Sequence, residues 1–270
     1  MATIHVTYYS QALSGQSEFY MVLPNDLPPM MAMMGGPNPA FQRPMKTLVL
    51  LHGYSGAAID WLAGSSIQDL CSQYNLAAIM PGCRNSFYLD REATGEAYGT
   101  FVGEELIAYA RKTFGLSDKA EDTFVCGFSM GGYGALEIGL KYTHNYGKLV
   151  DLSGALIYRE VAEMTPPNGN MVANYAYYAS TFGDPKKVLE SEANPEVLVK
   201  RKLAKGEKLP GIYIACGTED MLCPFNKAFS AFLTENGVAH EAHFTPGEHN
   251  WKFWDPYLQK SIPWLLGEEG

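Results

Sequence analysis

The chain has 270 residues, of which 47% are hydrophobic, and a formal net charge of −9; this is enough apolar material for one substantial core, at a length routine for a single α/β domain. The acidic balance disfavours nucleic acid and anionic membranes as partners, because both would repel the protein at long range. The sequence has no apolar run of membrane-spanning length, no glycine-rich loop before a P-loop lysine and no zincin histidine pair, so nothing implies a cofactor or a metal.

The N-terminus and the cysteines predict a cytoplasmic protein with reduced thiols. The segment Met1–Thr7 lacks both the basic region and the continuous apolar stretch of a secretory signal. The five cysteines are odd in number and form no Cys-x-x-Cys pair, and Cys126 and Cys216 lie in apolar runs that we expect to be buried strands. The oligomeric state stays open, and a homo-oligomer is one of the alternatives.

Apolar periodicity predicts an α/β fold in one domain, residues 1–270. We expect an antiparallel hairpin near 2–9 and 17–23, and buried strands near 46–52, 76–80, 122–127, 148–153, 210–216 and 239–244. Helices are expected near 60–74, 100–114, 130–142, 224–236 and 251–265. This alternation predicts a mostly parallel central sheet with helices on both faces.

A serine flanked by glycines forms the most informative turn. The stretch Gly127-Phe128-Ser129-Met130-Gly131 follows an apolar run and precedes a helical pattern. Such a serine between a buried strand and a helix builds a nucleophile elbow, where the positions two before and two after it have no room for side chains. Ser129 would stand at a helix N-terminus, whose amides favour negative charge. The alternative is a glycine-rich turn with a capping serine.

An oxyanion formed at Ser129 needs two fixed hydrogen-bond donors. One is expected to be the backbone N–H of Met130, the residue after the serine. The second should follow an earlier central strand, and the all-apolar run at 48–51 predicts a strand buried on both faces that ends in His52-Gly53-Tyr54. We therefore expect the N–H of Tyr54 to be the second donor, with a plain strand-to-helix turn as the alternative.

An activated serine also needs a base and an orienting carboxylate, and in hydrolases with this elbow both follow the serine along the chain. The apolar run at 209–216 breaks at a glycine and places Glu219 and Asp220 in the next loop. Asp220 is preferred because the shorter side chain is the commoner third member, while Glu219 and a solvated acidic turn remain alternatives. Of the six histidines, His249 alone lies in a loop immediately past a late strand, and it is the predicted base.

The stretch from Ala155 to Lys208 lies between two predicted central strands. A hydrolase inserts its cap at this position, and insertions of such length are usually functional or disordered. The tyrosines Tyr175, Tyr177 and Tyr178 either line a pocket or pack as ordinary aromatics, and packing is favoured because aromatic side chains are buried so readily.

Four motifs follow one another along the chain: Leu50-Leu51-His52-Gly53, the elbow with its helix at 127–135, Cys216-Gly217-Thr218-Glu219-Asp220, and His249-Asn250-Trp251. In this combination the chain resembles the esterase-D-type family of α/β-hydrolases, which includes tributyrin, acetyl and feruloyl esterases, S-formylglutathione hydrolases and antigen 85 mycolyltransferases. The resemblance covers nearly the whole chain, and Asn85-Ser86-Phe87-Tyr88 resembles the small-ester esterases of the group. It implies an α/β-hydrolase fold with the nucleophile, acid, base and oxyanion donors on Ser129, Asp220, His249, Tyr54 and Met130.

The chain departs from this family pattern in the methionine-rich loop at 30–34, which lengthens the connection before the first buried strand. An adaptable apolar flap at the pocket rim is one interpretation. A disordered surface loop is favoured, because prolines and glycines flank the methionines.

These features predict a serine carboxylesterase that hydrolyses small acyl esters through an acyl-enzyme intermediate. Phe128 in the elbow and Trp251 beside the base are expected to bind substrate and to restrict the pocket to short acyl chains. An S-formylglutathione hydrolase is the first alternative, ranked lower because no basic groups for the glutathione carboxylates are identifiable. An acyltransferase and then a non-catalytic binding protein follow.

Overall fold

The computed structural model describes residues 1–25 and 38–268, and the methionine-rich loop at 30–34 lies outside them. Within the described residues, one sheet has the strand order β1-β2-β4-β3-β7-β8-β9-β10. Its strands are β1 (Ala2–Ser10), β2 (Gly15–Leu23), β3 (Lys46–Leu51), β4 (Leu76–Pro81), β7 (Thr123–Phe128), β8 (Lys148–Leu152), β9 (Gly211–Gly217) and β10 (Glu241–Thr245). Strand β2 runs antiparallel to both neighbours, and every other neighbouring pair is parallel. The predicted mostly parallel sheet is confirmed.

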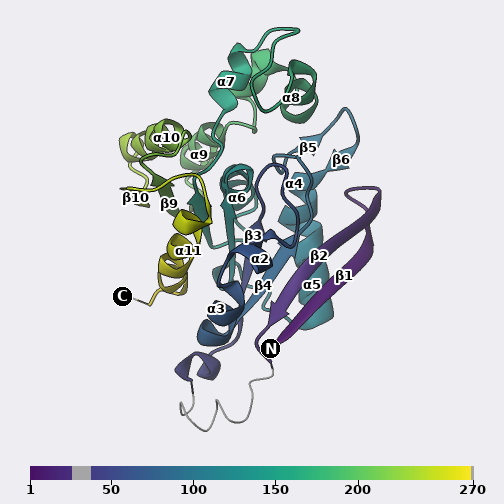
Figure 1. The fold of residues 1–270 in the computed structure, drawn as a ribbon, viewed down its shortest axis with the longest axis vertical. Coiled ribbons are helices and arrows are strands. Elements are labelled where there is room, and N and C mark those ends of the chain that lie inside the picture. Colours follow the sequence, from purple (N-terminus) through teal and green to yellow (C-terminus); the bar gives the residue numbers. More distant parts are fainter. Residues whose placement is uncertain (26–37, 269–270) are drawn as a thin grey trace.

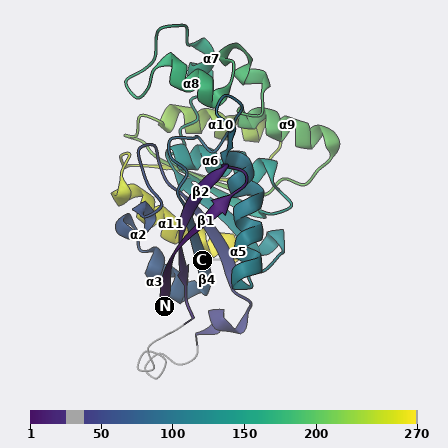
Figure 2. The same cartoon turned by 90° about the vertical axis from the view of Figure 1, so that its right-hand side faces the viewer.

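Helices cover both faces of this sheet (Figures 1 and 2). One face carries α2 (Asp60–Gly64), α3 (Ile67–Tyr74) and α11 (Trp251–Leu266), and the other carries α5 (Leu106–Phe114), α6 (Met130–Lys141) and α10 (Cys223–Glu235). Alternate residues of β3 face the two layers: Leu48 and Leu50 pack with α3 and α11, whereas Val49 and Leu51 pack with α5 and α6. A strand buried on both faces must be apolar throughout, which explains the unbroken run.

Two predicted helices are interrupted. The helix expected at 60–74 is divided into α2 and α3, because the N–H and hydroxyl of Ser66 both donate to Asp255 of α11, at 2.7 and 2.8 Å. The helix expected at 100–114 begins earlier, as α4 (Tyr98–Thr100), and passes through a π-helical turn, Phe101–Glu105, into α5. Short elements complete the chain: 3-10 turns at Pro39–Gln42 and Ala120–Asp122, and a two-stranded ribbon of β5 (Asp90–Arg91) and β6 (Glu96–Ala97).

The segment between β8 and β9 is helical. It holds α7 (Tyr158–Glu163), α8 (Tyr175–Phe182), a 3-10 turn at Pro185–Glu190 and α9 (Pro195–Lys205). Figures 1 and 2 show α7 and α8 beyond one end of the sheet, at the top of both views. Tyr178 of this segment lines a cavity together with Ser129, the residue after β7, so the segment lies near the end of the sheet where β7 and β8 end.

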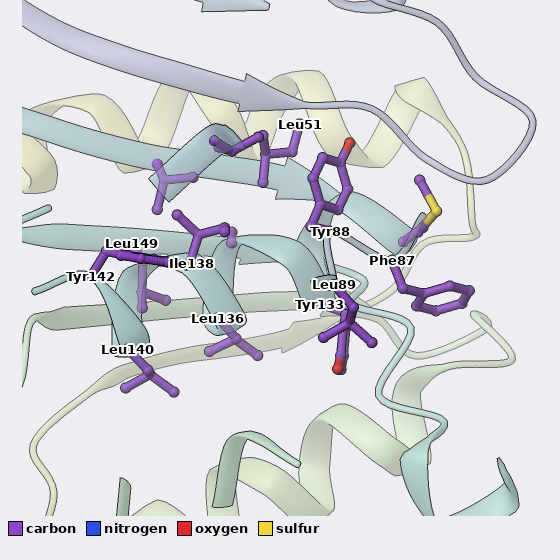
Figure 3. Packing of buried hydrophobic residues seen from close by; sticks show 14 of the residues in the cluster. Leu51, Phe87, Tyr88, Leu89, Tyr133, Leu136, Ile138, Leu140, Tyr142 and Leu149 are labelled. Carbon is purple, nitrogen blue, oxygen red and sulfur yellow. The ribbon is translucent and has the colours of Figure 1, made fainter. Parts of the chain in front are cut away.

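Helix α6 is the central helix of the molecule. Every residue from Met130 to Leu140 is buried, and Figure 3 shows the α6 side chains Leu136, Ile138 and Leu140 within the packed apolar cluster. The buried hydroxyl of Tyr133 donates to the carbonyl of Ala193 at 2.7 Å, which ties α6 to the segment between β8 and β9. The N-terminus of α6 is consequently held in a fixed position above β7.

Backbone segments meet at van der Waals distance where β7 turns into α6. A Cβ atom on Gly127 would lie 2.0 Å from the carbonyl oxygen of Gly131, and a Cβ on Gly131 would lie 2.1 Å from that of Leu51. These obstacles are backbone atoms of buried elements, so they cannot move aside as a flexible side chain could. Between the glycines, Ser129 adopts φ +57° and ψ −120°, a strained conformation for a residue with a side chain.

We predict that Gly131→Ala lowers the free energy of unfolding by ~3 kcal/mol or more, because the new methyl group collides with the end of β3. Gly15→Ala is the matched control, since the new methyl group would lie at an ordinary 3.7 Å from its nearest neighbour, the carbonyl oxygen of Leu13. Urea unfolding of both variants measures the difference. Equal stability of the two would contradict the packing described at the elbow.

Candidate active site

Three loops bring Ser129, His249 and Asp220 into one hydrogen-bonded array. Ser129 Oγ lies 3.0 Å from His249 Nε2, and His249 Nδ1 lies 2.7 Å from Asp220 Oδ2. The serine comes from the turn between β7 and α6, the aspartate from the loop after β9, and the histidine from the loop after β10. Because β9 and β10 are parallel neighbours, their C-terminal ends open side by side. The structure thus places together the three residues that the sequence singled out.

The carboxylate of Asp220 is buried and carries the charge of the array. Its side chain has no exposed surface, and Oδ1 accepts a hydrogen bond from the Leu222 N–H at 2.8 Å. Burial by itself would raise the pKa of Asp220, but hydrogen bonds from His249 and from the Leu222 N–H hold that pKa below its ordinary value. An ionised Asp220 accepts a hydrogen bond from the Nδ1–H of His249, which leaves Nε2 unprotonated and able to accept the hydroxyl proton of Ser129.

The neighbouring Glu219 has a different task. Its carboxylate accepts hydrogen bonds from the Thr218 hydroxyl at 2.9 Å and from the N–H of Gly247, and the bond from Gly247 lowers the pKa of Glu219. The loops after β9 and β10 are joined further by Thr218 N–H donating to Thr245 O at 2.8 Å. Glu219 therefore fixes the loop that carries His249 rather than contacting the imidazole.

The start of α6 and the loop after β3 face one cavity of about 440 Å³. Tyr54, Ser129, Met130 and His249 all line this space, which we call the Ser129 cavity. Ser129 stands at the N-cap position of the twelve-residue α6, and its side chain makes no capping hydrogen bond, so the hydroxyl is directed to His249. Negative charge beside Ser129 would be favoured by the positive end of the α6 dipole.

Apolar side chains form most of the Ser129 cavity wall. They are Tyr54, Phe87, Met130, Ala155, Ile157, Met171, Val172, Tyr178, Met221, Leu222 and Phe225. Glu160 and His249 are the titratable side chains on its wall besides the tyrosines, and no lysine or arginine of the described chain lines it. A larger cavity of about 870 Å³, lined by residues of α6 and α8, includes none of Ser129, Asp220 and His249.

Phe128 and Trp251, which we expected at the substrate, lie behind the site. Neither is among the described residues that line the Ser129 cavity. As the last residue of β7, Phe128 faces the α11 side of the sheet, where it stacks on Trp254 at 4.5 Å between centroids and meets Trp251 edge-on at 4.8 Å. Trp254 was missed from sequence: its ring stands at 90° to the His249 imidazole, 4.9 Å away. Trp254 therefore packs against the histidine, and Phe128 and Trp251 pack against Trp254.

The three tyrosines of the 155–208 segment differ in their positions. Tyr178 lines the Ser129 cavity, which agrees with the pocket-lining alternative rather than with the favoured ordinary packing. Tyr177 packs edge-on against Tyr54 at 5.7 Å between ring centroids, and its hydroxyl donates to the Asn85 carbonyl at 2.7 Å. It therefore packs against the loop after β3, which holds the expected oxyanion donor Tyr54. Tyr175 lines the larger cavity.

A second buried carboxyl, Asp151 at the end of β8, lies close behind Asp220. Among the described residues no cationic side chain pairs with it, and a Cβ on either Gly132 or Gly154 would come within 2.4 Å of its Oδ1. Burial raises the pKa of Asp151 to about 8, the Gly154 N–H offsets this in part, and the charge of Asp220 adds to it. At neutral pH Asp151 is therefore a neutral acid beside an ionised one. The sequence analysis did not single it out, although an acidic residue within a predicted buried strand is visible in the sequence.

Over residues 1–25 and 38–268, no group of three or more His, Cys, Asp or Glu side chains is arranged to hold a metal ion. In the same residues, no helix combines the length and apolarity needed to span a bilayer.

Comparisons with known proteins agree on one family. Residues 10–265 match the family model Esterase, described as "Putative esterase". Over 270 residues and 98% of both chains, the protein is 37% identical to an acetyl esterase of Caldicellulosiruptor saccharolyticus. Two Staphylococcus aureus structures, each 26% identical over 98% of both chains, superpose with TM-scores of 0.83 for the fluorophosphonate-binding serine hydrolase FphF and 0.81 for the S-formylglutathione hydrolase FrmB. The predicted family resemblance and the α/β-hydrolase fold are confirmed.

We predict that Asp220→Asn lowers kcat by roughly 10³- to 10⁴-fold without unfolding the protein, because the amide favours the wrong imidazole tautomer. Glu219→Gln is the matched control at the adjacent position, and it should lose far less activity. Ester hydrolysis and circular dichroism of both variants provide the measurement. The reverse ranking would transfer the orienting role to Glu219.

A second prediction concerns Asp151. Its pKa is about 4 when unfolded and about 8 when folded. Between these two pH values the carboxyl is ionised in the unfolded state but neutral in the folded state, so the free energy of unfolding falls as the pH rises. Asp151→Asn removes this loss, and its stability relative to the parent should rise by roughly 2 to 5 kcal/mol from pH 4 to 8. Urea unfolding across that range tests it. A difference that stays constant with pH would show that Asp151 is ionised in the folded protein.

Proposed function

The chain belongs to this esterase family and is a carboxylic ester hydrolase, and from that premise we propose that it transfers a small acyl group first to Ser129 and then to water. The observation that carries the proposal is the array itself. Ser129 Oγ, His249 and the buried Asp220 are joined by contacts of 3.0 and 2.7 Å, and the hydroxyl opens into a mainly apolar cavity. This is the geometry that nucleophilic acyl transfer requires.

In the first half of the reaction, Ser129 Oγ attacks the acyl carbon while His249 Nε2 takes the hydroxyl proton. The tetrahedral intermediate collapses as its bond to the alcohol oxygen breaks, and His249 gives its proton to the departing alcohol. In the second half, a water molecule attacks the acyl-enzyme, His249 takes a proton from the water and returns it to Ser129, and the carboxylic acid leaves. Asp220 stays ionised throughout and stabilises the imidazolium.

We further propose that the backbone N–H groups of Tyr54 and Met130 hold the oxyanion. Both residues line the cavity that contains Ser129, and Met130 begins α6. Fixed donors of this kind contribute ~10²- to 10³-fold each to the rate, because they are already oriented when charge develops.

The inner end of the Ser129 cavity supports a preference for short acyl groups. Phe87, Met130 and Tyr178 close it, and all three are buried side chains. The volume of about 440 Å³ also lies near the lower end of ligand-binding cavities. A long acyl chain would have to displace packed aromatic groups.

An S-formylglutathione hydrolase is the second candidate, because FrmB superposes on the chain with a TM-score of 0.81. The charges of the site argue against it. Glutathione carries carboxylates, whereas the described wall of the Ser129 cavity has Glu160 and no basic side chain. The nearby Arg159 is paired with Glu196 at 2.5 Å. An acyltransferase would need an alcohol that outcompetes water.

Three further expectations belong to this proposal. We propose that the 155–208 segment acts as a cap within a single domain, since it supplies Ile157, Met171 and Tyr178 to the Ser129 cavity. We also propose a cytoplasmic location, which the five free, buried cysteines support. The net charge of −9 supports a small-molecule substrate and neither nucleic acid nor anionic membranes as partners.

A substrate panel tests the proposal. With one alcohol held constant, kcat/KM should be highest for acetyl to butyryl esters and should decline toward octanoyl, with about 1 to 3 kcal/mol of discrimination for each methylene that does not fit. S-formylglutathione should be hydrolysed less efficiently than these esters. A maximum at octanoyl would reject the short-acyl preference, and a dominant rate on S-formylglutathione would establish the thioesterase instead.

A further inference from the structure

Exposed apolar side chains surround the mouth of the Ser129 cavity. Met171 is 93% exposed, Val172 51% and Met221 71%, yet all three line that cavity. Met171 and Val172 belong to the connection between α7 and α8, whereas Met221 belongs to the loop between β9 and α10. Two segments distant in sequence therefore contribute to one surface, which we call the apolar rim.

The apolar rim differs from the scattered exposure that is normal for proteins. Among the described residues, Met171 and Met221 are the two most exposed large apolar side chains, and both lie at this single cavity. Single exposed apolar residues need no explanation, but a group of them around a cavity marks a binding surface. Methionine suits such a surface, because its unbranched, polarisable side chain adapts to ligands of different shape.

The buried and the exposed parts of the Ser129 cavity suit the two halves of an ester, the acyl group and the alcohol. Its inner end, closed by Phe87, Met130 and Tyr178, has buried walls and suits the short acyl group. The alcohol must leave toward solvent after its bond to the acyl carbon breaks, and the way out passes the exposed side chains. The wall of the cavity carries the acidic Glu160. Among the described residues, no lysine or arginine lines the cavity, so nothing there would attract an anionic alcohol.

We propose that the apolar rim of Met171, Val172 and Met221 binds the alcohol portion of the substrate, so that the enzyme selects esters of apolar, uncharged alcohols over esters of sugars, polyols or anionic alcohols. This inference rests on the proposed function, in which Ser129 takes the acyl group. It adds the substrate class of the leaving group. Each alcohol methylene that is fully buried against the rim should improve kcat/KM by up to about fourfold.

The test uses acetates of linear alcohols from ethanol to hexanol, together with glycerol and glucose monoacetates. The unbranched alcohols leave with nearly the same intrinsic reactivity, so any trend in kcat/KM reports contact with the protein. We expect kcat/KM to rise two- to fourfold per methylene in the parent enzyme and the polyol acetates to be the poorest substrates. The double variant Met171→Gln, Met221→Gln replaces both methionines with polar side chains of similar length. In this variant kcat/KM should rise much less with each methylene of the alcohol.

Leu203→Gln is the matched control, because Leu203 is another exposed apolar residue, on α9 and outside the cavity. It should keep the slope of the parent enzyme. A flat series in the parent, polyol acetates as the better substrates, or an equal loss of slope in the control would each overturn the inference. Failure of the proposed function looks different, since hydrolysis of every acetate would then persist in Ser129→Ala.

Discussion

The close approach of three backbone segments at the start of α6 is the constraint on which the site depends. Gly131 lies against the end of β3, and Gly127 lies against Gly131, at distances that no side chain could share. This contact brings the loop after β3, with Tyr54, to the same cavity as the first amide of α6. It also holds Ser129 in a conformation that costs ~1 to 3 kcal/mol, which the burial of α6 on all sides offsets.

The contact between Asp220 and His249 depends on the pairing of the last two strands. Gly217 of β9 stands beside Thr245 of β10, so the loops that follow begin at the same edge of the sheet. Backbone hydrogen bonds and the Glu219 carboxylate join these loops, which fixes the distance between Asp220 and His249. Asp151 behind them remains protonated at neutral pH, because burial raises its pKa to about 8. Asp220 can therefore keep its charge without a second anion beside it.

Sequence patterns predicted most of the fold and the members of the array. The unbroken apolar runs predict strands buried on both faces. The order of Ser129, Asp220 and His249 along the chain is the order expected for a hydrolase with this elbow. The break between α2 and α3 was not predictable, because it depends on Asp255, which lies far away in sequence. The expectation that Phe128 and Trp251 bind substrate came from their proximity in sequence to Ser129 and His249. Such proximity does not reveal which face of the sheet a side chain occupies, and neither is among the described residues that line the Ser129 cavity. The apolar rim has no local signature, since it exists only where separate segments meet in the folded chain. Asp151 is visible in the sequence as an acidic residue within a predicted buried strand, but its raised pKa depends on burial in the folded protein.

The central claim is that Ser129 is the covalent nucleophile, and reaction of the folded protein with a fluorophosphonate tests it most directly. The account predicts that one fluorophosphonate group is added per chain, and that peptide mapping by mass spectrometry places it on Ser129. It also predicts that Ser129→Ala, with its fold verified by circular dichroism, takes up none. A label on another residue, or no label on the folded parent protein, would contradict the account.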